Sequence, residues 1–171
     1  MDLTQLASSP VPNAVAVGGA VVLAVVALAM RDRMRLPLAV LGALAVATVL
    51  MKNLSYDGLV SGVEGSLDAH RDYANALLWV VVAQVVLGVF LLLMATFSNR
   101  VRWLAVFAAL ASGSAALCMT GWRQAYLSGK PNVEYVLWSP PLHWVALIGL
   151  GVSLVIAVIS LVRRRPRVVT P

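Results

Sequence analysis

The sequence predicts an all-α integral membrane protein, a single domain built as a bundle of five transmembrane helices. Hydrophobic residues make up 61% of the chain and charged residues only 12%, whereas a soluble domain carries about 25% charged residues. The mean hydropathy is +0.89, and the charges lie between long uncharged stretches. We expect spans at about 14–30, 36–53, 73–97, 103–121 and 142–162, with outer loops at 54–72 and 122–141.

The distribution of basic residues predicts the orientation of the bundle. The segments assigned to the inner side hold nine of the 13 basic residues and one acid, Asp32: Arg31, Arg33, Arg35, Arg100, Arg102, Arg163, Arg164, Arg165 and Arg167. Short cytoplasmic segments are enriched in Lys and Arg. We therefore expect the N-terminus outside, the C-terminus in the cytoplasm, and the chain in the plasma membrane.

The first two spans are the shortest. Only Asp2 precedes the first apolar stretch, without the basic region of a signal peptide, so we expect a retained helix. The second stretch reaches membrane length only if Lys52 extends its side chain toward the interface. A re-entrant or interfacial segment is the alternative, but it would place the basic clusters on opposite sides of the membrane.

The third span, 73–97, follows a charged segment. At ~1.5 Å per residue it reaches roughly 37 Å, enough to cross a hydrocarbon core of about 30 Å. Ser66 is a plausible N-cap, so the helix should begin near Leu67, above the membrane.

The last two spans differ in composition. The fourth is rich in Ala, Ser and Gly, which let helix backbones approach closely in lipid, and we expect it at the centre of a core formed by the last three spans. Before the fifth span, Ser139-Pro140-Pro141 suggests the end of the preceding loop.

The two histidines, His70 and His143, are both expected at the outer side of the membrane. Two histidines at one depth on different helices could ligate b-type haem or border a quinone, with Tyr73, Trp138 and Trp144 beside the ring. The alternative is that both are interfacial residues in contact with headgroups. A three-ligand metal site with Asp68 and Asp72 is not expected, because helical geometry turns His70 about 200° away from both carboxylates.

Two amides, Asn75 and Gln84, fall within the third span. A polar side chain at this depth usually bonds to a neighbouring helix, and Cys118 and Thr120 on the fourth span are candidate partners. Cys118 is the only cysteine, so an intramolecular disulfide and a CxxC redox pair are excluded.

The sequence contains no phosphate-binding loop, no HExxH, no GxSxG and no acid within a span. We therefore assign no catalytic residues and no metal site, and we expect a non-catalytic subunit or accessory protein of a larger membrane assembly. Its partners would be the lipid bilayer and other membrane subunits, not nucleic acid. A small redox protein with b-type haem or quinone is the alternative, and a small transporter or channel is the third hypothesis.

Overall fold

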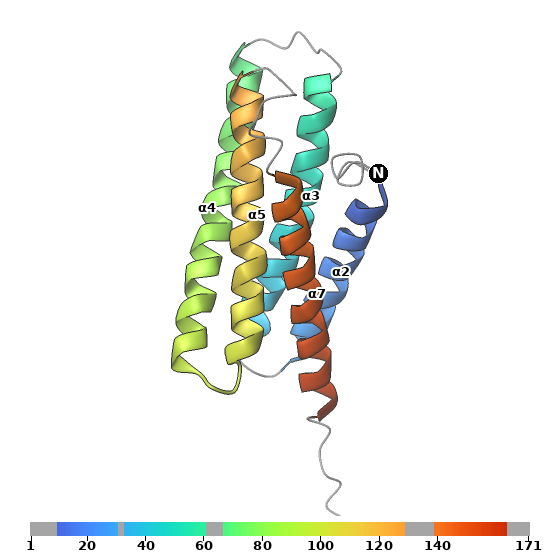
Figure 1. Cartoon of the computed structure of the whole chain (residues 1–171), viewed down its shortest axis with the longest axis vertical. Helices are drawn as coiled ribbons and strands as arrows, with labels where there is room; N and C mark the ends of the chain where they lie inside the picture. Colours follow the sequence, from blue (N-terminus) through green and yellow to red (C-terminus); the bar gives the residue numbers. More distant parts are fainter. Residues whose placement is uncertain (1–9, 31–32, 61–66, 129–138, 164–171) are drawn as a thin grey trace, which may run out of the picture.

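The computed structural model describes residues 10–30, 33–60, 67–128 and 139–163, and this part of the chain is helical, without strands. The helices are α2 (Pro10–Ala29), α3 (Arg35–Val60), α4 (Leu67–Phe97), α5 (Arg102–Ser128) and α7 (Ser139–Arg163). They lie side by side along one long axis (Figure 1). The predicted all-α class is confirmed.

Three of these helices are long and apolar enough to cross a membrane by length and composition. The stretches are Ala74–Phe97 in α4, Arg102–Gln124 in α5 and Pro141–Arg163 in α7, and they coincide with the third, fourth and fifth predicted spans. The apolar stretches of α2 and α3, Ala14–Ala29 and Arg35–Met51, are shorter. The chain therefore has the character of a membrane protein.

The helices extend further than the apolar stretches that predict them. The loop expected at 54–72 is helical up to Val60, and the loop expected at 122–141 is helical up to Ser128. Polar side chains do not stop these helices, because a helix satisfies its own backbone hydrogen bonds whether or not its side chains are apolar.

The start of α7 also differs from the expectation. Ser139-Pro140-Pro141 forms the first turn of α7 instead of ending a loop. Proline is tolerated there because the first N–H groups of a helix have no partner within it. By contrast, α4 begins at Leu67, where it was expected.

The central helix of the bundle is α5. The most apolar window of α5 is 61% buried, against 28% for α4 and 22% for α7. It packs against α3, α4 and α7. Its buried residues are mostly small: Ala105, Ala108, Ala109, Ala111, Ser112, Ser114 and Ala116. The composition of the fourth span thus identified the most buried of the three helices long enough to cross a membrane.

Two close helix contacts define the packing. A Cβ at Gly42 of α3 would lie 2.7 Å from the backbone oxygen of Ala20 on α2. A Cβ at Gly149 of α7 would lie 3.0 Å from the backbone nitrogen of Ala111 on α5. Because α2 and α3 also supply buried side chains such as Leu23 and Leu38, the core extends beyond the last three spans.

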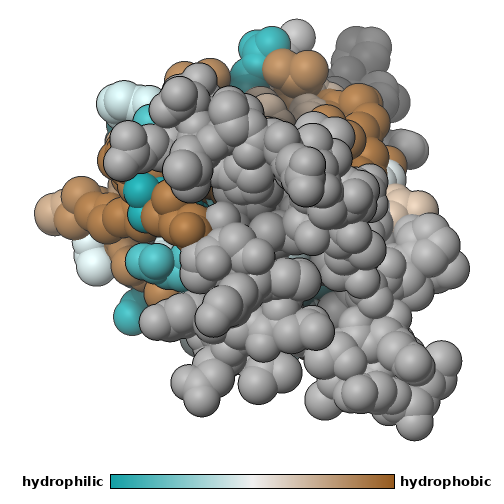
Figure 2. Space-filling view, turned by 90° about the horizontal axis from the view of Figure 1, so that it is seen from above, coloured by the Kyte–Doolittle hydropathy of each residue, from teal (hydrophilic) through white to brown (hydrophobic). Residues whose placement is uncertain are grey.

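Between Leu78 and Phe97, the exposed side of α4 is mostly apolar. It exposes many large hydrophobic side chains: Leu78, Trp79, Val82, Val85, Val86, Val89, Phe90, Leu92, Leu93 and Phe97. Seen along the long axis, hydrophobic surface lies on the side of the bundle that α4 occupies (Figure 2). Such a surface suits lipid or another apolar helix.

The α7 helix is displaced along the long axis of the bundle. In Figure 1, the upper end of α7, where it starts, lies below the upper ends of α4 and α5, and its lower end lies below theirs. This axial offset brings the first turns of α7 beside the middle of α3 and α5.

Candidate functional site

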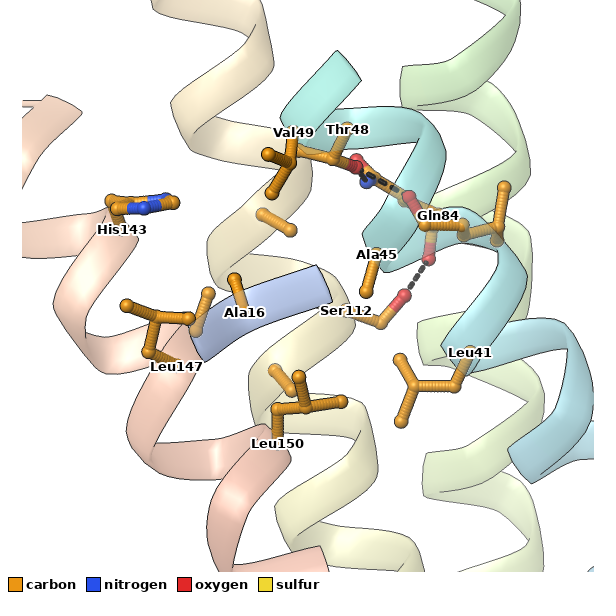
Figure 3. Close-up of a pocket in the computed structure, with 14 residues that line it drawn as sticks. Ala16, Leu41, Ala45, Thr48, Val49, Gln84, Ser112, His143, Leu147 and Leu150 are labelled. Atoms are coloured by element: carbon orange, nitrogen blue, oxygen red, sulfur yellow. Dashed lines mark hydrogen bonds between the residues drawn. The ribbon is translucent and has the colours of Figure 1, made fainter. Parts of the chain in front are cut away.

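Three helices contribute polar side chains to the middle of the bundle: Thr48 from α3, Gln84 from α4 and Ser112 from α5. All three are at least 95% buried. Gln84 Nε2 donates a hydrogen bond to Thr48 Oγ1, and Ser112 Oγ donates to the backbone oxygen of Gln84 over 2.7 Å (Figure 3). The side-chain amide of Gln84 therefore bonds to α3 through Thr48, and the backbone carbonyl of Gln84 bonds to α5 through Ser112.

The hydrogen bonds of Thr48 determine the orientation of the Gln84 side-chain amide. The Thr48 hydroxyl donates to the backbone oxygen of Leu44 over 2.7 Å. A hydroxyl carries a single hydrogen, so Thr48 Oγ1 must accept from Gln84, and the atom beside it must be the amide nitrogen.

The other atom of the amide, Gln84 Oε1, is buried without a hydrogen-bond donor among the described protein atoms. A buried acceptor in this state costs about 1–3 kcal/mol.

Gln84 lines a cavity between α3 and α7. The volume open to the centre of a water molecule is about 40 Å³. Apolar side chains form most of its wall, including Leu41, Ala45 and Leu150. Thr48, Ser112 and His143 also line it, with His143 on the α7 side opposite Gln84 (Figure 3).

His143 is 4% exposed. The sequence suggested an interfacial position for it, but the offset of α7 places it in the wall of the central cavity (Figures 1 and 3). His70 lies in the first turn of α4, and its side chain is outside the described residues. The first turn of α4, which contains His70, and the first turns of α7, which contain His143, lie at different levels (Figure 1). The haem or quinone site between His70 and His143 stays a prediction.

The remaining candidates are separated from the cavity or outside the described part. Asn75 is exposed at the start of the α4 span. Trp144 is partly buried next to His143, whereas the side chain of Tyr73 and all of Trp138 fall outside the described residues. The hydroxyl of Thr120 donates to Ala116 O of its own helix.

The aromatic residues at the two ends of the bundle differ in exposure. Phe97 at the end of α4 and Trp103 at the start of α5 are 86% and 68% exposed. Trp122, toward the other end of α5, is only 5% exposed. Beside it, Arg123 Nε donates to the backbone oxygen of Ala74 over 3.1 Å and so links α5 to α4. At this end of the bundle, Trp122 and Arg123 thus contribute to helix packing.

Within the described ranges, no group of three or more His, Cys, Asp or Glu side chains could hold a metal ion. The described polar groups of the core mainly hydrogen-bond to backbone or to one another.

Thr48 and Ser112 were missed at the sequence level because single hydroxyls in an apolar stretch give little signal. Ser112 lies near the middle of its predicted span, as Gln84 does, and this shared depth could have identified it, whereas Thr48 lies closer to one end of its span. Comparison with known proteins finds no matching family model, no matching curated protein and no matching solved structure.

Proposed function

We propose that this chain is a multi-pass protein of the plasma membrane that acts as a non-catalytic subunit or accessory protein of a larger membrane assembly. The observation that carries the proposal is the use of the core's polar side chains. Thr48, Gln84 and Ser112 bond α3, α4 and α5 together, and Ser153 bonds to its own helix. Polar groups used in this way support packing rather than chemistry.

The surface of the bundle supports the membrane and partner parts of the proposal. The apolar outer side of α4 can face lipid or another transmembrane helix. The α7 helix, which packs against α5 and α2, offers a second such side, with Ile148 and Val155 exposed. Other subunits can pack on both of these lateral surfaces.

Native electrophoresis and site-specific photo-crosslinking test the partner proposal. A crosslinker is placed at Val86 on α4 or at Ile148 on α7, which are both 62% exposed, and at buried Leu87 as a control. In membranes from the source cells, we expect a discrete crosslinked band from one exposed site and none from Leu87. The same partner should co-migrate with the chain after mild solubilisation. A monomer without crosslinks from either surface would contradict the proposal.

The proposed topology has five spans with the N-terminus outside. Arg33, Arg35, Arg100, Arg102 and Arg163 are exposed at the end of the bundle where α2, α4 and α7 end. Basic residues at one end favour a cytoplasmic position for that end.

Thiol labelling of intact cells tests this orientation. In a Cys118→Ser background, Gln124→Cys and Asn99→Cys place single thiols at exposed positions near opposite ends of α5. A membrane-impermeant maleimide should label Gln124→Cys in intact cells and Asn99→Cys only after permeabilisation. The reverse pattern would overturn the orientation.

A further inference from the structure

The cavity between α3 and α7 holds a buried acceptor that the described protein atoms leave unsatisfied. Gln84 is 1% exposed, and its Oε1 has no hydrogen-bond donor among the described residues. The amide cannot turn to solve this, because Thr48 needs the nitrogen and donates its own hydrogen to Leu44. The Ser112 hydroxyl cannot supply the hydrogen either, because it donates to the backbone oxygen of Gln84. A bound molecule can supply the missing hydrogen.

The size and composition of the cavity limit what this molecule can be. A volume of about 40 Å³ holds roughly three water molecules, at about 10–15 Å³ each on the same measure. No carboxylate lines the cavity among the described residues, so a cation would be buried without a counter-charge. Leu41, Ala45 and Leu150 form an apolar wall that suits a short alkyl group.

We propose that this cavity binds a small neutral molecule that donates a hydroxyl hydrogen to Gln84 Oε1. Water and a short alcohol share this chemistry, and both fit the volume. The site would place a hydroxyl group near the middle of the α4 span, beside the hydrogen bonds that join α3, α4 and α5. The proposal does not depend on the existence of partner subunits.

Solid-state NMR of the full chain in phosphatidylcholine nanodiscs tests the proposal without any substitution. The chain has three glutamines, and only Gln84 precedes a valine. Labelling with ¹³C-glutamine and ¹⁵N-valine therefore assigns Gln84 through its bond to Val85. Magnetisation transfer to the Gln84 side-chain carbonyl is then measured from water protons, and separately from protonated 1-propanol in D₂O. Gln124, which is exposed, is the positive control for water.

A cross peak from water to Gln84 would identify an internal water, and one from 1-propanol would identify a site for an organic hydroxyl. Either result supports the proposal. A spectrum in which Gln124 contacts water while Gln84 contacts neither probe would overturn it.

Filling the cavity should remove the contact. Ala45→Leu projects into the cavity from α3, and Ala115→Leu fills it from α5 if the first variant does not fold. We expect the Gln84 cross peak to be lost in the folded variant. It should be retained in Val86→Leu, which lies on the exposed side of α4. A cross peak that persists after filling would place the donor elsewhere and contradict the proposal.

Discussion

Gly42→Ala is expected to lower the free energy of unfolding by about 1–3 kcal/mol, the usual cost of overpacking a well-packed core. The added Cβ would lie 2.7 Å from Ala20 O and 3.1 Å from the Cβ of Ala24. A backbone oxygen cannot rotate away as a side chain can, so α2 and α3 must separate. The loss of helix contact is then shared along both helices.

Unfolding by SDS in mixed micelles provides the measurement. Cys118, the only cysteine, is 1% exposed, so its modification by a maleimide reports the opening of the bundle. Gly18→Ala on α2 is the matched control, because its Cβ would meet nothing within 4 Å. Equal midpoints for Gly42→Ala and Gly18→Ala would show that α2 and α3 do not pack as described.

Leu91→Ala should destabilise the bundle by about 2 kcal/mol or more, near the low end of the range for large-to-small core substitutions. Leu91 is fully buried in the core on α4. In a membrane protein the lipid is as apolar as the side chain, so the cost comes from lost packing and the cavity that remains.

Leu92→Ala is the control for this effect, since Leu92 is the next residue and is 53% exposed. Lipid chains can fill the space that it leaves, and we expect no measurable change in the SDS midpoint. A loss of stability at Leu92 equal to that at Leu91 would mean that this side of α4 is covered by protein in the micelle. The pair therefore measures which side of α4 faces the core.

Local sequence features predicted most of the helical framework. The uncharged stretch at 73–97 and the one at 142–162 indicated α4 and α7 because a membrane requires long apolar helices. The small residues of 103–121 indicated the central position of α5. The helix ends were less predictable, since the polar extensions to Val60 and Ser128 carry no apolar periodicity.

The candidate site depended far more on tertiary structure. The sequence identified Gln84 as a buried amide that needs a partner, but its partner Thr48 lies 36 residues away, on another helix. Which hydroxyl meets an amide depends on how far each helix slides along its neighbour, and local sequence does not determine that displacement.

His143 illustrates the same limit. Its place at the start of the fifth span suggested a position at the membrane surface. From sequence alone, the depth of a residue can be estimated only from its distance to the end of its own span. The close contact of Gly149 with Ala111 and Phe107 sets α7 against α5, and α7 begins lower than α4 (Figure 1). The sequence alone therefore determined that the chain forms long apolar helices and which helix is central. The tertiary structure decided their axial offsets, and so which polar side chains share the cavity, because those offsets arise from side-chain packing between distant segments.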